Sequence, residues 1–383
     1  MLKLIKNANV FAPAAQGQKD ILIGGEKILA ISDKIDSFAQ ITEVWDAEGK
    51  SVTPGLIDQH VHFCGAGGKH GFASMTPEIM LSEFTACGTT TVVGMLGTDA
   101  SARSIKTLYA KTKALDKEGI TAYMFTSYFG IDPVTITGSI QDDLIFIDKV
   151  IGCKVAISDE RSSYPTTLEL LRHLRDVHVG GLISGKGGIM HVHLGGLSSK
   201  MDILFELVKE FEFPIRHISP THVGRSKVLF DQALDFARLG GIIDITTGAS
   251  KYTEPWKAVI YALEQGVSID NLSFSSDGHA GIAKKDSNGR EVGFGMAPIN
   301  QNLLQMKALV QQGGIDLAEA LKLITTNPAK NLSLPQKGKI AVGADADLCF
   351  FDRQMNLTHV IARGQLMMQD SKILVRGNFD NCN

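Results

Sequence analysis

The sequence lacks the features that would place a chain in or across a membrane. None of its apolar stretches approaches the ~20 residues needed to cross a bilayer. The first residues, MLKLIKNANVFAP, contain neither a long apolar segment nor a small-residue cleavage site, which are typical of a secretory signal. We therefore expect an unprocessed cytoplasmic chain without a membrane partner.

Basic runs and aromatic-interleaved basic patches are also missing. The 383-residue chain has a formal net charge of −3, and its Lys and Arg residues are spread along the sequence. Domains that bind nucleic acid usually concentrate such residues. A content of 44% hydrophobic and 21% charged residues is instead typical of a soluble globular protein. A nucleic acid is therefore not an expected partner.

Cysteine is scarce and scattered. The five cysteines are odd in number and form no CxxC pair: Cys64, Cys87, Cys153, Cys349 and Cys382. They predict neither a disulfide framework nor a cysteine zinc site. We interpret most of them as small core residues.

Both ends of the chain are rich in strand-forming residues. Short β-favouring runs separated by turn residues occupy positions 1–54, with Gly24-Gly25 as the expected hairpin turn. Positions 338–383 have the same character, as in DADLCFFD and LTHVIARGQLMMQ. We predict that these two segments form one small β domain.

The middle of the chain, residues 55–337, has a longer period. Strand-like runs recur, mostly about thirty residues apart, beginning near Leu56, Gly88, Ala122, Cys153, Gly188, Ile218, Gly241 and Leu272. Helical patterns lie between them, and two of these, PEIMLSEFTACG and SKVLFDQALDFARLGG, end in glycine, a common helix stop. This alternation predicts an α/β fold of the TIM-type (β/α)8 barrel, with an open doubly wound sheet as the alternative.

Two histidines end the first of these runs, LIDQHVHF. His60 and His62 are two residues apart, so on a strand their side chains point to the same face. Neutral imidazoles are good zinc ligands. A histidine beside an apolar run is also a common core or loop residue, and the pair alone leaves both interpretations open.

Other predicted strands carry matching groups. Lys154 lies within the apolar run CKVAISD, although lysine is rarely buried without a partner. GIMHVHL ends with His193, ISPTHVG with His222, and LSFSSDG with Asp277. The C-terminal ends of barrel strands converge on one place, so these residues predict a metal centre. His191 faces the same way as His193 but lies deeper, and we interpret it as a core residue or a neighbour of a metal ligand.

This arrangement resembles the amidohydrolase superfamily, which has HxH on strand one, Lys on strand four, His on strands five and six, and Asp on strand eight. PGLIDQHVHF and GADADL are typical of that superfamily. VVGMLGTD, TITGS, AISDERS, PTHVGR and SSDG also occur in the order and spacing of the bacterial isoaspartyl (β-aspartyl) dipeptidases. The likeness covers nearly the whole chain, including its β-rich ends.

The resemblance implies a centre of two Zn²⁺ ions, with other divalent metals possible. Its implied ligands are His60, His62 and Asp277 for one ion, and His193 and His222 for the other. Lys154 would bridge the ions as a carbamate formed with CO2, because a carbamate offers anionic oxygen ligands and an ammonium does not. Asp277 would take the proton of the attacking water and pass it to the leaving amine.

The resemblance also implies substrate contacts and assembly. Arg161 and Arg225 match arginines that hold substrate carboxylates, a task that suits the bidentate guanidinium. Further contact positions are matched by Thr98 and by the glycines Gly65, Gly67 and Gly68. The loop 278–296 is expected to be either a lid or a disordered excursion. Family members form large oligomers, which implies a homo-oligomer here.

Three positions depart from the family pattern. Lys69 replaces a glutamate that receives the substrate α-ammonium, Phe129 an oxyanion-stabilising tyrosine, and Gly281 a serine. Because a lysine repels an ammonium, another group would have to receive it. Glu160 is the nearby candidate in the sequence.

Together with these residues, the resemblance implies a binuclear zinc hydrolase of amide bonds that cleaves β-aspartyl dipeptides. Lys69 makes an N-acyl amino acid or an acidic amide without a free amine the alternative substrate. A cyclic-amide hydrolase of the dihydroorotase or hydantoinase type is a second alternative, although the motifs outside the metal site disfavour it. A non-catalytic binding protein on a barrel scaffold is a third, and the complete set of metal ligands argues against it.

Overall fold

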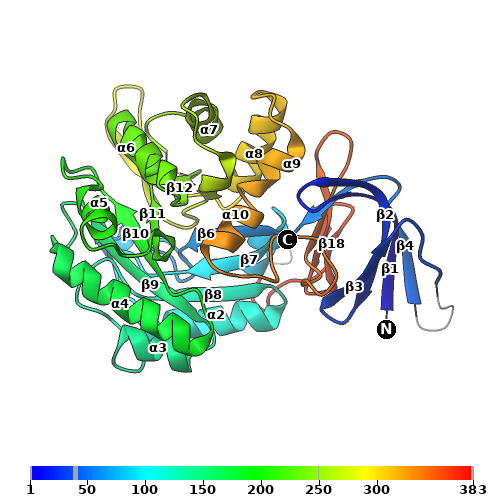
Figure 1. Cartoon of the computed structure of the whole chain (residues 1–383), viewed down its shortest axis with the longest axis horizontal. Coiled ribbons are helices and arrows are strands. Elements are labelled where there is room, and N and C mark those ends of the chain that lie inside the picture. The colour runs from blue at the N-terminus through cyan, green and yellow to red at the C-terminus, as the bar shows by residue number, and fades with distance from the viewer. Residues whose placement is uncertain (1, 38–41, 249, 381–383) are drawn as a thin grey trace.

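The structure, a computed structural model, describes residues 2–37, 42–248 and 250–380. Its larger part is a barrel of parallel strands with helices on the outside, and a second β-sheet stands beside one end of the barrel (Figure 1). The first and last strands of the chain lie together in that second sheet. The fold class predicted from the sequence is therefore confirmed.

The second sheet takes its strands from both ends of the described chain. They are β1 (Leu2–Phe11), β2 (Ala15–Gly24), β3 (Lys27–Ser32), β4 (Thr42–Asp46), β5 (Ser51–Pro54), β16 (Leu348–Phe351), β17 (Leu357–Ala362), β18 (Gln365–Gln369) and β19 (Lys372–Ile373). Their order is β19-β18-β17-β16-β5-β1-β2-β3, and β4 pairs with β1. Antiparallel pairing of β5 with β16 joins the two ends of the chain. The exact domain boundaries stay a prediction.

One turn in this sheet differs from the prediction. Gly24 still pairs with Lys27, so the hairpin turn consists of Gly25 and Glu26 rather than Gly24 and Gly25. Gly25 has φ 57°, in the left-handed region that suits glycine. The sequence offered two adjacent glycines, and only the register of the strands decides which one turns.

The barrel is built from parallel strands in sequence order. They are β6 (Leu56–Val61), β7 (Thr89–Gly94), β8 (Thr121–Ser127), β9 (Val150–Ile157), β10 (Ile189–Leu194), β11 (Ile218–Thr221), β12 (Ile243–Thr246) and β13 (Leu272–Ser275). A parallel bridge between Val61 and Gly278, and a hydrogen bond of 2.9 Å from His62 N to Gly278 O, close the circle between the first and last strands. The alternative of an open doubly wound sheet is therefore wrong.

The barrel strands are buried on both faces, which explains their composition. All eight positions of β9, from Val150 to Ile157, are buried. Strands covered by helices on one side and by barrel core on the other have near-continuous apolar sequences. A charged residue such as Lys154 in this run therefore requires a specific reason.

Helices cover the outside of the barrel. They are α1 (Leu81–Thr85), α2 (Ile105–Glu118), α3 (Ile140–Phe146), α4 (Thr167–Ser184), α5 (Asp202–Lys209), α6 (Lys227–Arg238), α7 (Pro255–Glu264), α8 (Gln301–Gln311), α9 (Leu317–Lys322) and α10 (Thr326–Asn331), with short 3₁₀ turns η1 (Phe72–Ser74), η2 (Ile215–His217), η3 (Val223–Arg225) and η4 (Ile269–Asn271). The helix predicted at 226–241 is α6, which begins after the N-cap Ser226. The helix predicted at 77–88 is shorter than its pattern, since only α1 forms there.

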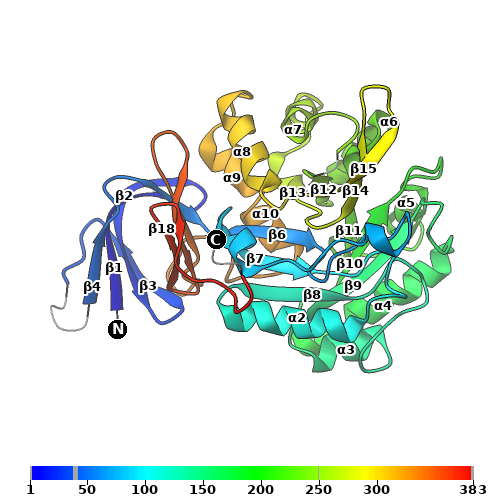
Figure 2. The same cartoon turned by 180° about the vertical axis from the view of Figure 1, so that it is seen from behind.

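The loop 278–296 forms an ordered antiparallel hairpin of β14 (Gly281–Lys285) and β15 (Glu291–Met296). The expectation of a disordered excursion is therefore wrong, while closure as a lid stays a prediction. The hairpin lies at the end of the barrel away from the second sheet (Figure 2). Since β5 leads directly into β6, the barrel strands point away from that sheet, and their C-terminal ends face the hairpin side.

A buried lysine joins the barrel to the second sheet. Lys337 Nζ lies 2.6 Å from Thr121 Oγ1 at the start of β8, 2.7 Å from Asp347 Oδ2 and 2.8 Å from Asp345 Oδ2. Burial alone would lower the pKa of Lys337, but the two carboxylates outweigh burial and raise it above its usual value. The lysine therefore stays charged inside a satisfied cluster.

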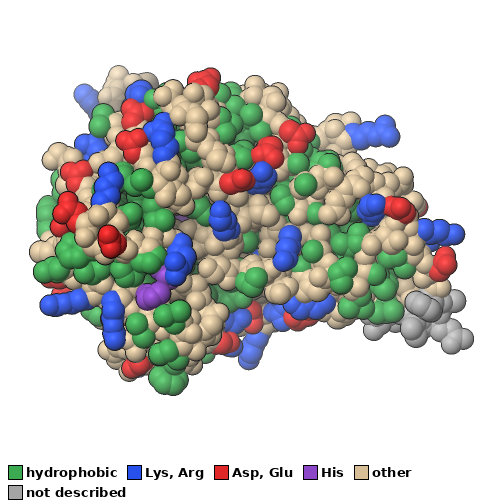
Figure 3. Space-filling model, viewed as in Figure 1, with side chains coloured by type: hydrophobic (Ala, Val, Ile, Leu, Met, Phe, Trp, Pro, Cys, Tyr) green, Lys and Arg blue, Asp and Glu red, His purple; other side chains and the backbone are tan. Residues whose placement is uncertain are grey.

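Positive and negative side chains are scattered over the face shown in Figure 3. Cys64, Cys87, Cys153 and Cys349 are buried free thiols, and Cys382 lies outside the described residues. Across residues 2–37, 42–248 and 250–380, none of the helices combines the length and apolar character needed to cross a membrane.

Candidate active site

A cavity of about 520 Å³ opens at the C-terminal end of the barrel. Most of the site residues proposed from the sequence line it: His60, His62, Gly67, Lys69, Thr98, Phe129, Lys154, Arg161, His193, His222, Arg225, Asp277 and Gly281. Gly65 and Gly68, the other two glycines of the run, are not among the lining residues. The positions of the lining residues in the chain are up to 221 residues apart, from His60 to Gly281, and the barrel brings them together. Glu160 is exposed and does not line the cavity, so it is not placed to receive an ammonium there.

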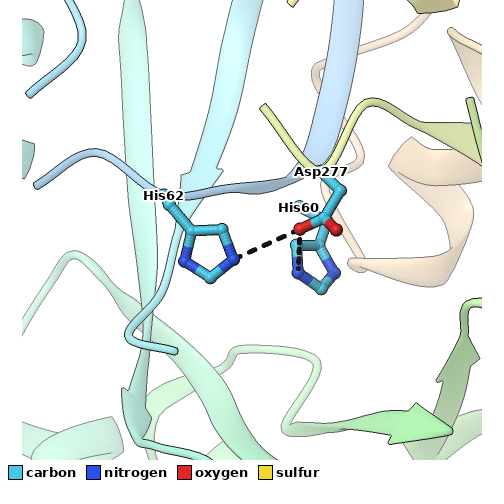
Figure 4. Close-up of side chains that lie close together, drawn as sticks. All are labelled: His60, His62 and Asp277. Carbon is cyan, nitrogen blue, oxygen red and sulfur yellow. Dashed lines mark ion pairs between the residues drawn. The ribbon is translucent and has the colours of Figure 1, made fainter. Parts of the chain in front are cut away.

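Three side chains form a compact cluster at the bottom of the cavity. Asp277 Oδ1 lies 3.3 Å from His60 Nε2 and 3.2 Å from His62 Nε2 (Figure 4). One ligand atom from each residue lies within 4.8 Å of the other two. Asp277 Oδ1 is buried and has no partner with hydrogen-bond geometry in the described chain. A carboxylate oxygen and two imidazole nitrogens that converge without hydrogen bonds fit a bound cation.

The protonation of this cluster suits metal binding. Burial lowers the pKa of His60 to about 3, and it lowers the pKa values of His193 and His222 well below the usual range. Burial alone would raise the pKa of Asp277, but the neighbouring imidazoles hold it well below its usual value. Neutral imidazoles with free lone pairs and an ionised carboxylate are the forms that bind zinc.

Lys154 lies on β9 directly beside this cluster. Its Nζ is 3.4 Å from His60 Nε2 and 3.1 Å from Met95 Sδ. In the described part of the chain it forms no ion pair with a carboxylate. Burial lowers the pKa of Lys154 to about 7, against the opposing effect of Asp277. A buried lysine without a carboxylate partner must lose or neutralise its charge by some means other than an ion pair.

Contacts from the surrounding strands hold the imidazole rings. His60 Nδ1 lies 2.9 Å from His191 Nε2, and His191 Nδ1 lies 3.0 Å from Ser219 Oγ. His222 Nδ1 lies 2.6 Å from Thr246 Oγ1. Histidine ligands usually use the second ring nitrogen for such an orienting hydrogen bond. His191 was expected to be a core residue or a neighbour of a metal ligand. It is buried and contacts His60, a proposed ligand.

The backbone at the strand ends has an uncommon conformation. Ser127, Ser158, His222 and Asp277 follow or end β8, β9, β11 and β13, with φ values of 67°, 54°, 65° and 54°. Left-handed conformations are unfavourable for residues other than glycine, and they occur often at functional sites. Here they redirect the chain where His222 and Asp277 face the cavity.

The two arginines enter the cavity with different partners. Arg161 forms a bidentate pair with Asp159, with 2.8 Å from Nε to Oδ1 and 2.6 Å from Nη2 to Oδ2. Its guanidinium also lies 5.2 Å from the centre of the Phe129 ring. Arg225 is more deeply buried, and its Nη2 lies 3.0 Å from His193 Nε2. Arg225 therefore contacts a proposed metal ligand directly, whereas Arg161 is connected to His193 through Asp159.

The glycine loop and the hairpin fit closely together. A Cβ on Gly67, which has φ 107°, would lie 2.5 Å from Ser74 O, so this position requires glycine. A Cβ on Gly281 would lie 3.1 Å from Gly67 Cα, which explains why a larger residue at 281 would press on the loop. Lys69 follows this loop, and burial together with Arg161 and Arg225 lowers its pKa.

Two acidic residues near the cavity were not singled out from the sequence. Glu291, on β15, lines the cavity, and its Oε2 lies 3.4 Å from His70 Nε2. The His70 ring in turn lies 4.8 Å from the ring of Phe294, which is also on β15. Asp159 stood within the quoted motif AISDERS, beside Arg161, and this adjacency was its available signal. Glu291 had none, because the pairing of the hairpin was not evident.

Comparison with known proteins bears on this arrangement. The Amidohydrolase family matches residues 51–367 of the chain. A crystal structure of the β-aspartyl dipeptidase from Fervidobacterium islandicum AW-1, in complex with β-Asp-Leu dipeptide, is 42% identical, covers 97% of this chain and 98% of its own, and gives a TM-score of 0.91.

More distant relatives have other names. A dihydroorotase from Streptococcus pyogenes serotype M1 is 27% identical over 395 residues, with 92% of this chain and 91% of the relative covered. The dihydropyrimidinase from Brevibacillus agri NCHU1002, at 19% identity and a TM-score of 0.69, shares the fold. The chain belongs to the amidohydrolase family and, within it, to the β-aspartyl (isoaspartyl) dipeptidases, as a hydrolase of amide bonds.

Proposed function

We propose that this protein is a binuclear zinc enzyme that hydrolyses β-aspartyl dipeptides. The observation that carries the proposal is the convergence of four histidines, Lys154 and Asp277 at the barrel mouth, with Arg161 and Arg225 beside them. The similarity to a dipeptidase crystallised with β-Asp-Leu supports the choice of substrate. Zinc, rather than another divalent metal, is favoured by the neutral imidazole ligands.

In this proposal His60, His62 and Asp277 hold one ion, and His193 and His222 hold the other. Asp277 Oδ1 is buried and has no hydrogen-bond partner among the residues that the structure describes, which supports the first group. The ring centroids of His193 and His222 lie 4.5 Å apart, which supports the second. Lys154 would bridge the ions as a carbamate, which would remove its unpaired buried charge. When bound, the metals supply Lewis acidity, which polarises the scissile carbonyl and lowers the pKa of a water.

Asp277 is the group proposed to move the proton. Its carboxylate is ionised and lies at the bottom of the cavity, so it is able to accept the proton of the attacking water. It would then deliver that proton to the nitrogen of the leaving amine. Phe129 has no hydroxyl, so it contributes an apolar wall rather than a hydrogen bond to the developing oxyanion.

The two arginines are proposed to bind the two carboxylates of a β-aspartyl dipeptide. Both line the cavity beside the proposed metal ligands. Arg161 uses Nε and Nη2 for Asp159, which leaves Nη1 for a ligand. Charge-assisted contacts of this kind are strong and geometrically specific. They would fix the dipeptide at both ends of the scissile bond.

The α-ammonium of the substrate requires a different partner from Lys69. The carboxylates among the cavity-lining residues are Asp277 and Glu291. Since Asp277 is assigned to the metal and the proton, we assign the ammonium to Glu291 on the hairpin. Its present partner is His70, at 3.4 Å, a contact that an incoming ammonium would replace. Glu291 thus replaces Glu160, which the sequence had suggested as the group that receives the ammonium.

An N-acylated β-aspartyl or related acidic amide is the second candidate substrate. The observation that favours it is Lys69, a cation on the wall of the cavity beside two arginines. Such a lysine would favour a neutral or anionic group over an ammonium. The dihydroorotase relatives, at 27% identity, support amide hydrolysis in general and cyclic amides only weakly.

A hydrolysis screen tests these assignments. The zinc-loaded protein would be incubated with β-Asp-Leu, with N-acetyl- and N-succinyl-β-Asp-Leu, and with dihydroorotate, and product amines and ring opening would be measured. We expect β-Asp-Leu to have the highest kcat/KM. A preference for an acylated dipeptide would select the second candidate. Turnover of dihydroorotate alone would overturn the dipeptidase proposal.

Assembly and location also stay proposals that rest on the resemblance. We expect a homo-oligomer, located in the cytoplasm. Size-exclusion chromatography with light scattering measures the mass directly. A monomer at micromolar concentration would contradict the first expectation.

A further inference from the structure

Asp159 lies between a proposed metal ligand and a proposed substrate-binding arginine. It is buried at 4% exposure, whereas Arg161 reaches the cavity mouth. Asp159 Oδ1 accepts from Arg161 N at 3.0 Å and from Arg161 Nε at 2.8 Å. Asp159 Oδ2 accepts from Arg161 Nη2 at 2.6 Å and lies 3.1 Å from His193 Nε2. One carboxylate thus contacts both groups.

From this geometry we propose that Asp159 is a positioning residue that couples the metal centre to carboxylate binding. It would select the tautomer of His193 that binds metal, and it would hold Arg161 in place for the substrate. The inference rests on the proposed function, since it takes His193 as a zinc ligand and Arg161 as a substrate contact.

The tautomer argument follows from the partners of His193 Nε2. This nitrogen lies 3.1 Å from Asp159 Oδ2, an acceptor, and 3.0 Å from Arg225 Nη2, a donor. Only one of these contacts is a hydrogen bond at a time. With the proton on Nε2, His193 donates to Asp159 and its Nδ1 lone pair is free for metal. With the proton on Nδ1, Nε2 accepts from Arg225 and metal binding through Nδ1 is blocked.

His193 thereby differs from two other proposed ligands. His60 and His222 use Nδ1 for their protein contacts, with His191 and Thr246, and present Nε2. His193 has its protein contacts on Nε2, so it presents Nδ1. Asp159 is the acceptor that stabilises this choice. The same tautomer deprives Arg225 of its acceptor and leaves its Nη2 available for a substrate carboxylate.

A second set of contacts ties Arg161 to the same unit. Its guanidinium lies 5.2 Å from the Phe129 ring centre, and that ring lies 4.5 Å from the His193 ring. The bidentate pair with Asp159 fixes the plane of the guanidinium against Phe129. Asp159 would therefore orient both His193 and the guanidinium of Arg161 that binds the substrate carboxylate.

The competing explanation is that Asp159 only neutralises and anchors Arg161. Asp159→Asn separates the two explanations. Two donors of Arg161 converge on Oδ1, so the amide oxygen would stay there and the NH2 group would take the place of Oδ2. That group would donate to His193 Nε2, move the imidazole proton to Nδ1 and oppose metal binding. Arg161→Met is the matched control, because it removes the guanidinium and leaves the Asp159 carboxylate.

The experiment measures zinc affinity by competition with a chelator, zinc content after dialysis, and kcat and KM on β-Asp-Leu. We expect Asp159→Asn to lose about 10- to 100-fold in affinity for one of two zinc ions, with a lower kcat. Arg161→Met should keep both ions and raise KM. Asp159→Glu, which keeps an acceptor-only group, should recover part of the zinc affinity.

The outcomes separate this inference from the proposed function. If Asp159→Asn folds, as judged by circular dichroism, and binds both ions as tightly as the parent, the coupling is refuted. If Asp159→Asn does not fold, the zinc affinity of Asp159→Glu is compared with that of Asp159→Ala. An equal loss of zinc affinity in these two variants would refute the tautomer argument. A third outcome is that Asp159→Asn loses zinc while the parent does not hydrolyse β-Asp-Leu. This result would support the role of Asp159 in metal binding and reject the proposed substrate.

Discussion

Two buried lysines in this molecule have opposite surroundings. Lys337, at the junction of the barrel and the second sheet, lies within 2.8 Å of both Asp345 and Asp347. Lys154, at the barrel mouth, has His60 and Met95 as its neighbours and no carboxylate within ion-pair distance in the described chain. The pKa of Lys337 is raised by its partners, whereas burial lowers that of Lys154 to about 7.

The difference separates a structural lysine from one suited to chemistry. A buried ammonium with two carboxylates is fixed in its charged form and links two parts of the fold. A buried lysine without them is unstable as an ammonium, and its neutral amine is free to react. Burial alone does not distinguish the two lysines, and the count of carboxylate partners does.

The strongest test of the comparison is Lys154→Ala. We expect loss of bound zinc and of hydrolysis down to the background rate. In the absence of zinc, the melting temperature should be close to that of the zinc-free parent, because no ion pair is broken. Short carboxylic acids should restore part of both by replacing the bridging carbamate. Zinc content and turnover measure the effect. Lys251→Ala, at another cavity-lining lysine, is the control and should keep its zinc; a fully active Lys154→Ala would contradict the bridging role.

Asp277→Asn tests the proton transfer at the same mouth. The amide keeps the size of the side chain but does not carry a proton between water and the leaving amine. We expect kcat to fall on the order of 10²- to 10⁴-fold, while the fold and at least one zinc ion are retained. Turnover within a few-fold of the parent would remove Asp277 from this role.

Lys337→Met tests the structural side of the comparison. It leaves the buried Asp347 without its lysine partner, while the partly exposed Asp345 keeps Lys27. Breaking a buried pair destabilises by roughly 3–5 kcal/mol. Lys27 is the matched control, because its pair with Asp345, at 2.5 Å, is partly exposed; Lys27→Met should change stability by about 0–1 kcal/mol. Denaturant unfolding measures both. Equal stabilities of the two variants would show that burial of the pair is unimportant.

The same cluster predicts a pH dependence of stability. The folded pKa of Lys337 is above its unfolded value, so its contribution is complete below the unfolded pKa, about 10.4 for lysine. The contribution is lost as the pH rises through the folded pKa. The parent should therefore lose more stability than Lys337→Met between pH 9 and pH 12. Parallel pH profiles would contradict this assignment.

The barrel and the polar residues at its mouth could be predicted from sequence because each carries a local signal. Apolar runs at a regular period predict parallel strands, and a polar residue at the end of a run, such as His222 or Asp277, then lies at the common mouth. Lys154 was conspicuous because a charge interrupts an apolar strand. The turn at Gly25 was misplaced by one residue because two glycines offered the same local signal.

The loop residues could not be placed in the same way. Glu160 was expected near the ammonium because it is close to Arg161 in sequence, yet it is exposed. Glu291 reaches the cavity because β14 and β15 pair as a hairpin that folds back over the barrel mouth. The direction of a side chain in a loop depends on such tertiary pairing, and this pairing produces no periodic pattern in the sequence.

The smallest predicted effects concern Lys69 and Glu291. Lys69 adds a third lysine to the comparison, one that lines the cavity. It lies near two arginines, and Glu291 lines the same cavity. Glu291→Gln should lower kcat/KM for β-Asp-Leu by about 10-fold, the loss of one charge-assisted contact, and leave N-acetyl-β-Asp-Leu unchanged. Lys69→Glu should raise the first activity and lower the second, by up to roughly 10²-fold in their ratio. If both variants keep the parent's ratio of the two activities, neither residue faces the amine, and the ammonium is bound by water or remains in solvent.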